Sequence, residues 1–177
     1  MDDKAVQALA SVIVLLFVFI IILCPVIALW IYLIRQNWQR NRIRERILTS
    51  RTELIGQRRW FPVRYASQPR FELLFKIVPW DTAGILVAAP GSILFLGESL
   101  AGVPITLQFA PVNSRLNWLG KSPWPNGAVS WLFFDTANGK HYFSSETGLM
   151  VFGSHRSTRE IYDEANRNFV SQPAQNN

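Results

Sequence analysis

Two histidines and one cysteine are the side chains of this chain with the most potential for catalysis or metal binding. His141 and His155 have no second His or Cys at metal-ligand spacing, and Cys24 lies inside a long apolar run. Asp135 and Ser144 lie near His141 in the sequence, but geometry defines a Ser–His–Asp triad, and the chain has no G-x-S-x-G motif. No glycine-rich run leads into a helix with the lysine of a phosphate loop. The sequence therefore predicts no catalytic residue, no metal site and no cofactor.

Tryptophans in expected loops are better candidates for a binding role. Trp124 stands between two prolines in the segment Gly120–Gly127, and Trp80 lies in the segment Pro79–Ala83. A rigid, exposed Trp is a good anchor for a partner protein or for the membrane interface. The alternative is that Trp124 folds back and fills one end of a β core, since Trp is usually well buried. We expect Trp80 and Trp124 to be the candidate partner-binding residues.

A long apolar run near the N-terminus predicts a transmembrane helix over residues 8–34. Only two of its 27 residues, Ser11 and Pro25, are not apolar, and about 20 helical residues span a hydrocarbon core of ~30 Å. The excess length predicts a tilt or a kink, and Pro25 is the expected kink site. A cleaved signal peptide has a shorter apolar region that ends in a small-residue site. Lipid attachment at Cys24 needs a small residue where Leu23 stands. An uncleaved anchor is the better interpretation.

Basic residues follow this apolar run and set the expected orientation. Residues 35–76 contain eleven Lys and Arg against three Glu, a net charge of +8, while the whole chain carries +6. Positive charge stays on the cytoplasmic side, so residues 1–7 are expected outside and the rest inside, at an inner or plasma membrane. The residues expected at the membrane surface are Trp30, Tyr32, Arg35, Trp38, Arg40, Arg42, Arg44 and Arg46.

The basic segment 35–56 is expected to be a helix or linker beside the membrane, because residues 35–55 contain no Pro or Gly. Ile43, Ile47 and Leu54, with Ile55 as a further candidate, recur near helical spacing and form a weak apolar stripe. The arginines have two interpretations: attraction to anionic lipid headgroups, at about 1 kcal/mol per basic residue, or topology alone. Nucleic acid is not an expected partner, because the chain has no zinc-finger, helix-turn-helix or RNP-like motif.

Short aromatic, aliphatic and β-branched runs, separated by Gly, Pro and Asn, predict a β domain over residues 57–170. It is expected to begin with an irregular segment at Arg58–Pro62. The expected strands are Phe71–Val78, Gly84–Ala88, Ser92–Leu96, Pro104–Phe109, Ser114–Leu119, Ala128–Asp135 and Lys140–Ser144. Tight turns are expected at Ala89–Gly91 and Thr136–Gly139, which hold the Gly that such turns favour.

The last expected element is a helix at Ser157–Phe169. Ser157 and Glu160 have capping-box spacing, so each can satisfy a free backbone donor at the helix start. Ile161, Ala165 and Phe169 recur every four residues and predict one apolar face. Residues 171–177 form a polar tail that is expected to be disordered.

Seven strands followed by one amphipathic helix resemble a pleckstrin-homology-like (PH-like) domain, in particular its GRAM-like bacterial relatives. The resemblance covers Phe71–Phe169, and its best local pieces are Gly84–Gly97, Trp131–Asp135 and His141–Phe143. It implies a seven-strand barrel that the helix caps at one end. Phosphoinositide-binding members carry basic residues in the loop after the first strand, and Pro79–Ala83, expected to be that loop, has none. The last helix also lacks the Trp found in many members. The resemblance therefore implies the fold but not the lipid-headgroup site; a generic sandwich or small barrel is the alternative.

The expected fold class is mainly β with α: a transmembrane helix, then a PH-like barrel with a C-terminal helix. Three functional hypotheses follow. The first is a membrane-anchored, non-enzymatic adaptor that binds an unknown protein or peptide partner. The second is an accessory subunit of a larger membrane complex, held mainly by its transmembrane helix. That helix has no G-x-x-x-G motif, which weakens a packing role. The third, an enzyme, has the least support in the residues.

Overall fold

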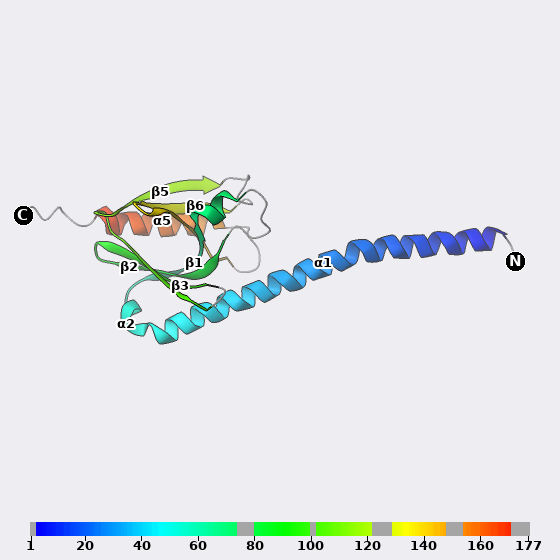
Figure 1. Ribbon diagram of the computed structural model, residues 1–177, viewed down its shortest axis with the longest axis horizontal. Coiled ribbons are helices and arrows are strands. Elements are labelled where there is room, and N and C mark those ends of the chain that lie inside the picture. The colour runs from blue at the N-terminus through cyan, green and yellow to red at the C-terminus, as the bar shows by residue number, and fades with distance from the viewer. Residues whose placement is uncertain (1–2, 74–79, 100–101, 122–128, 148–153, 171–177) are drawn as a thin grey trace, which may run out of the picture. The chain divides into compact units, whose positions relative to one another are not determined.

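The computed structural model describes residues 3–73, 80–99, 102–121, 129–147 and 154–170, and divides the chain into two compact units, 1–38 and 39–177. Figure 1 shows the long N-terminal helix and the curled sheet. The helix, α1 (Asp3–Ser50), belongs mostly to the first unit, and its last turns belong to the second. The predicted fold class is confirmed: an apolar N-terminal helix, seven antiparallel strands and a C-terminal helix.

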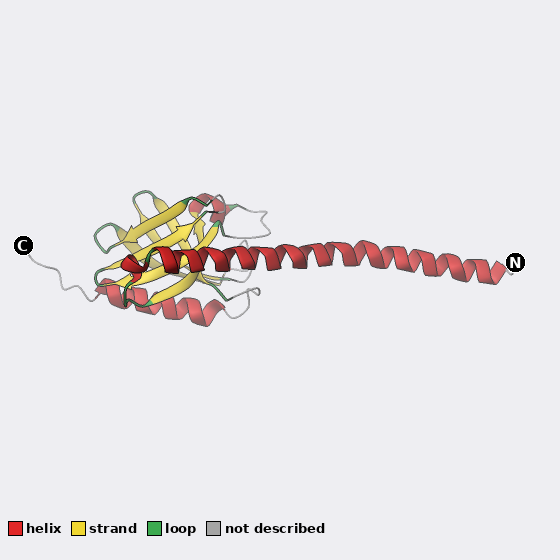
Figure 2. Ribbon diagram, turned by 90° about the horizontal axis from the view of Figure 1, so that it is seen from below, coloured by secondary structure: helices red, strands yellow, loops and turns green. Residues whose placement is uncertain are grey.

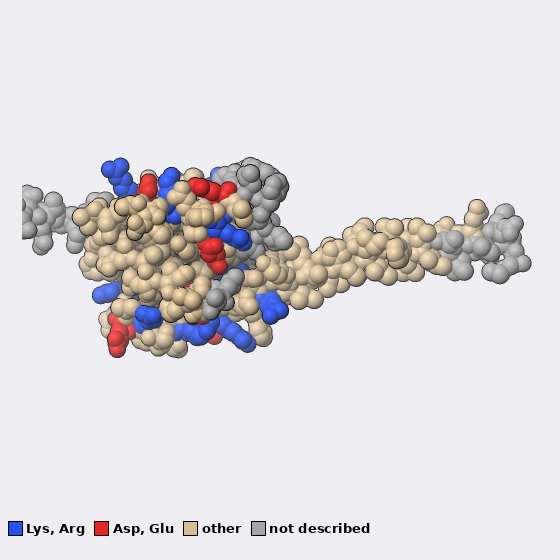
Figure 3. Space-filling model, in the orientation of Figure 1, with Lys and Arg blue, Asp and Glu red and all other residues tan. Residues whose placement is uncertain are grey.

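The first unit is a helix long and apolar enough to cross a membrane. Its most apolar stretch has a mean hydropathy of 3.5, and the side chains in that stretch have no protein neighbours that bury them. Pro25 lies inside the helix, as the sequence predicts. In Figure 3 this part of α1 shows no charged side chain on the visible face, whereas charged side chains are scattered over the visible face of the second unit.

The second unit is built on one seven-stranded antiparallel sheet with the strand order β4-β3-β2-β1-β7-β6-β5. The strands are β1 (Trp60–Ser67), β2 (Thr82–Ala89), β3 (Ser92–Glu98), β4 (Pro104–Phe109), β5 (Ser114–Lys121), β6 (Ser130–Thr136) and β7 (Gly139–Ser145). Strand β1 joins the two halves of the sheet, since it pairs with β2 on one side and with β7 on the other. The predicted turns at Ala89–Gly91 and Thr136–Gly139 connect β2 to β3 and β6 to β7, and both Gly91 and Gly139 have positive φ.

The first predicted strand was wrong. Its N-terminal residues form a short helix, α3 (Gln68–Glu72), and residues 74–79 lie outside the described part of the chain. The actual first strand, β1, lies upstream and takes in part of the segment predicted to be irregular. Its inward residues alternate with a proline and an arginine. Neither of these is typical of a strand, so the sequence pattern did not predict one here. Pro62 is tolerated because it lies before the stretch where β1 is paired on both sides.

The main core fills the inside of the curled sheet. Its members come from six strands and the last helix: Val63, Tyr65, Leu86, Ile93, Phe95, Phe109, Leu132, Phe134, Phe143, Ile161 and Ala165. The aromatic rings stack closely; those of Phe109 and Phe134, for example, have centroids 4.1 Å apart. Two further apolar clusters lie on the outer face of the sheet, so much of that face is also covered.

The last helix, α5 (Ser154–Val170), packs on the sheet with the predicted face. Ile161 and Ala165 are buried, and Phe169 packs against the same core. The helix begins before Ser157, so that residue lies inside the helix and the predicted capping box does not mark its start. Thr158 has a tertiary role instead, because its hydroxyl accepts a 3.0 Å hydrogen bond from the N–H of Ser145.

Candidate functional site

The C-terminal turns of α1 pack on the outer face of the sheet. Figure 2 shows these turns in front of the strands. Ile43 and Ile47 of α1, with Ile55 of α2 (Thr52–Ile55), are each 5% exposed or less. They cover three outward-facing residues of β2 and β3, namely Ile85, Val87 and Leu96. Leu54, the third member of the predicted stripe, is 38% exposed. The segment expected to be a helix or linker beside the membrane therefore contributes three residues to the core of the β unit.

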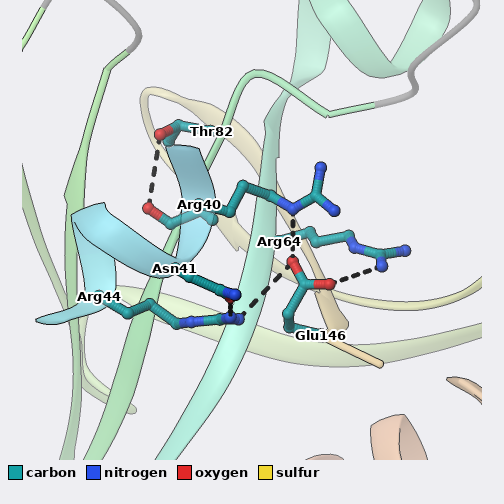
Figure 4. Close-up of polar contacts among 7 residues, drawn as sticks. Arg40, Asn41, Arg44, Arg64, Thr82 and Glu146 are labelled. Atoms are coloured by element: carbon teal, nitrogen blue, oxygen red, sulfur yellow. Dashed lines mark hydrogen bonds and ion pairs between the residues drawn. The ribbon is translucent and has the colours of Figure 1, made fainter. Parts of the chain in front are cut away.

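Beside this contact, three arginines converge on one buried glutamate (Figure 4). Glu146 follows β7, and its side chain is 1% exposed. One carboxylate oxygen pairs with the Arg64 guanidinium at 2.6 Å, and the other lies 2.8 Å from Nε of Arg40 and 3.7 Å from Nη1 of Arg44. Arg64 comes from β1, while Arg40 and Arg44 come from α1. The cluster therefore ties α1 to the sheet.

The cluster carries more positive than negative charge. Burial lowers the pKa of Arg40 and of Arg44, and the charge of Arg64 lowers both further, although Glu146 opposes this. Burial alone would raise the pKa of Glu146, but the hydrogen bond and charge of Arg64, with the charges of Arg40 and Arg44, bring it below its usual value. Glu146 therefore stays ionised, and its charge is the main compensation for the guanidinium groups around it.

Trp80 is buried against this cluster rather than exposed. It is 8% exposed, and its ring lies 4.3 Å from the guanidinium carbon of Arg64 and 5.3 Å from that of Arg40. Its other neighbours are the apolar residues of the second outer cluster, which include Phe71 and Trp131. The expectation that Trp80 is an exposed anchor is therefore wrong, because cation–π contacts and apolar packing occupy its ring. Trp124 lies outside the described residues.

The residues predicted for the membrane surface divide into two sets. Arg40 and Arg44 point toward Glu146, so their guanidinium groups are used inside the β unit. The other arginines of the set, Arg35, Arg42 and Arg46, are exposed, and Arg46 also pairs with Glu98 at 2.8 Å. The aromatic members, Trp30, Tyr32 and Trp38, are exposed residues of the first unit. Headgroup binding by Arg40 and Arg44 would require α1 to leave the sheet.

The loop after the first strand has other bounds than predicted. Because β1 ends at Ser67, the connection to β2 runs over residues 68–81 rather than Pro79–Ala83. This longer connection contains Arg70 and Lys76. The expected absence of basic residues from this loop is therefore wrong.

The two histidines take part in contacts within the fold. Nδ1 of His141 lies 3.1 Å from the Tyr65 hydroxyl, and its ring lies 5.5 Å from that of Phe109. Nδ1 of His155 lies 2.9 Å from the hydroxyl of Ser130, whose side chain is fully buried. Within the described ranges no group of three His, Cys, Asp or Glu could hold a metal ion.

We expect His141 to make the fold sensitive to mild acid. Burial lowers the pKa of His141, so the unfolded chain binds a proton that the folded chain resists. Its contribution to stability is full above the ordinary histidine pKa near 6.5 and is lost as pH falls from there toward the lowered value. Melting temperatures measured from pH 7.5 to 5 should fall less in His141→Gln than in the wild type. An identical pH slope in both proteins would contradict this, and His155→Gln is the control.

The two edges of the sheet differ in how they are protected. The β5 edge carries the exposed charges of Arg115 and Lys121 and has a register shift between Trp118 and Gly120. Helix α5 also packs on β5, where the rings of Trp118 and Tyr162 lie 5.6 Å apart. Strand β4, at the other edge, contains no charged residue, and no described strand pairs with its outer side. Natural sheets protect their edges with charges, prolines, bulges and covering elements. Of the two described edges, β4 is the less protected, because Pro104 at its start is the protecting residue that its sequence contains.

Comparisons with known proteins identify no family for this chain. No protein-family model matches the chain, and neither a curated protein nor a solved structure matches it. The strand order and the C-terminal helix are compatible with the PH-like resemblance, which no match supports.

Proposed function

We propose that this chain is a membrane-anchored, non-enzymatic adaptor whose PH-like β unit binds a protein or peptide partner at the cytoplasmic membrane surface. The observation that carries the proposal is the docking of α1 on the sheet through Ile43, Ile47 and the arginine cluster around Glu146. An adaptor needs its binding domain held at the bilayer, and here the segment that follows the apolar run is part of that domain.

The covalent distance between the two parts supports the same proposal. Four residues, 35–38, lie between Ile34, the end of the apolar run, and Gln39, the start of the second unit, so five Cα–Cα steps join the two. Even a fully extended chain of five residues spans at most about 18 Å. A β unit on so short a tether stays within reach of headgroups and of membrane-bound partners. The basic excess after the apolar run favours the cytoplasmic side.

The roles of the reactive side chains favour binding over catalysis. His141 and His155 contact Tyr65 and Ser130 and help to hold the fold. Glu146 is enclosed by arginines rather than facing a cavity. These groups do not converge on a shared space where a substrate could react.

Co-purification in mild detergent tests the adaptor function. We expect a partner to remain bound when residues 8–34 are replaced by an unrelated apolar helix, and to be lost when residues 39–177 are replaced by an unrelated folded domain. The reverse pattern would favour the accessory-subunit hypothesis. Protease added to right-side-out vesicles should leave the β unit intact, and its digestion there would reverse the proposed orientation.

A further inference from the structure

We propose that the β4 edge is the binding site of the β unit, and that it takes an extended partner segment as an additional strand. The segment would have uncharged side chains along most of its length and one carboxylate. This inference rests on the proposed adaptor function and specifies which surface performs it.

Side chains on the inner face of β4 are anchored in the core, and no strand in the described part of the chain pairs with the outer edge of β4. Ile105 and Leu107 pack against the main core, and Phe109 is buried in it. Their neighbours Thr106 and Gln108 point to the opposite side and are exposed. Six backbone pairings with β3 hold the strand in register. An incoming strand would therefore meet a preformed edge, with little ordering of β4 itself.

Exposed apolar side chains flank both ends of this edge. Val103 precedes the strand and is 60% exposed, and Val112 follows it and is 93% exposed. Val103, next to the start of β4, is placed where a strand longer than β4 would cover it, and Val112 lies in the turn that follows β4. Backbone hydrogen bonds supply affinity in strand addition, and the flanking apolar contacts add to it.

A cavity beside β4 supplies selectivity. It has a volume of about 80 Å³ and lies between the end of α1 and the outer face of β3 and β4. Its lining includes Ile47, Leu96 and Thr106, which are suited to a short side chain, and Glu98 and Arg51, which are charged. Glu98 already pairs with Arg46. Arg51 is thus the cation at the cavity that can receive a carboxylate from the incoming strand.

Binding of an immobilised peptide array to the full chain in detergent tests the inference. The peptides have seven residues, with alternating valine and threonine and one aspartate placed at each position in turn. We expect at least one peptide to bind and to slow amide hydrogen exchange in β4. N-methylation of alternate peptide residues should weaken that binding at least tenfold, because it removes the backbone donors. Failure of every peptide on the array would overturn the inference.

Substitutions on the two edges locate the site. Thr106→Lys combined with Gln108→Lys places charge on the β4 edge and should weaken binding at least tenfold. Leu119→Lys, at an exposed position on β5, should leave binding unchanged. Arg51→Gln should remove the preference for aspartate over an all-neutral peptide. Unchanged melting temperatures would show that the β4 substitutions block binding rather than folding. Equal binding by the β4 and β5 variants would overturn the inference.

Two outcomes separate this inference from the adaptor function. If the β4 variant still co-purifies with the partner, the edge is not the site, and the adaptor function stands. If the full chain is a dimer that the β4 substitutions convert to a monomer, without peptide binding, the edge pairs with a second copy and the peptide inference is overturned.

Discussion

Replacing Glu146 with Gln will destabilise the β unit by about 3–5 kcal/mol, the usual cost of removing one partner from a buried ion pair. The negative charge of the Glu146 carboxylate compensates the positive charges of Arg40, Arg44 and Arg64. The substitution removes that negative charge and leaves the three guanidinium groups in a desolvated site. Domains of this size have about 5–15 kcal/mol of stability, so the loss is a large share of the total. Urea unfolding of residues 39–177, followed by tryptophan fluorescence, measures it.

Glu160→Gln is the matched control for this prediction. Glu160 pairs with Arg156 on the surface of α5, with side chains 60% and 92% exposed. An exposed pair of this kind contributes about 0–1 kcal/mol, so the control should unfold near the wild-type midpoint. If Glu146→Gln were as mild as the control, the cluster would not hold α1 on the sheet.

The same carboxylate sets a dependence on pH. Because the arginines lower the pKa of Glu146 in the folded state, its contribution to stability is full above the pKa of the unfolded chain. It is lost as pH falls through the lowered value. The wild type should therefore lose stability steeply in strong acid, below the range in which His141 acts. Glu146→Gln should lack the strong-acid part of that loss.

The parts of the fold that depend on local pattern could be predicted from the sequence. The apolar run, six of the seven strands and the inward face of α5 all follow from hydrophobic periodicity. Strand β1 could not be recognised in this way, because Arg64 occupies an outward position that is buried by other elements. Its partner Glu146 lies 82 residues away in the sequence. Only the pairing of β1 with β7 brings the two side chains together.

The docking of α1 was partly visible in the sequence. Ile43 and Ile47 formed the predicted stripe, but Arg40 and Arg44 lie on the same face and read as membrane-surface residues. Arginine is common beside a transmembrane helix, so the topology rule explained the whole set. The signal that separates the two kinds of arginine is their spacing. Residues 40, 43, 44 and 47 share one helical face, while Arg35, Arg42 and Arg46 lie off it.

A fragment that begins at residue 57 will fold poorly, whereas one that begins at Gln39 will fold cooperatively. The shorter fragment lacks Ile43, Ile47 and Ile55, which cover the outer face of β2 and β3. Burial of each such side chain contributes about 1.5–3 kcal/mol, which gives an upper value of about 5–9 kcal/mol for the three. The fragment also lacks Arg40 and Arg44, so Glu146 keeps only Arg64.

Point variants of the longer fragment distinguish packing from chain length. Ile43→Ser with Ile47→Ser should lower the free energy of unfolding by several kcal/mol, because each replaces a buried apolar side chain with a polar one. Leu54→Ser, at a position 38% exposed in the same segment, should cost much less. Binding of a hydrophobic dye should rise in the double variant and in the fragment from residue 57, because both expose Ile85, Val87 and Leu96. A stable, dye-free fragment from residue 57 would show that the sheet does not need α1 to fold.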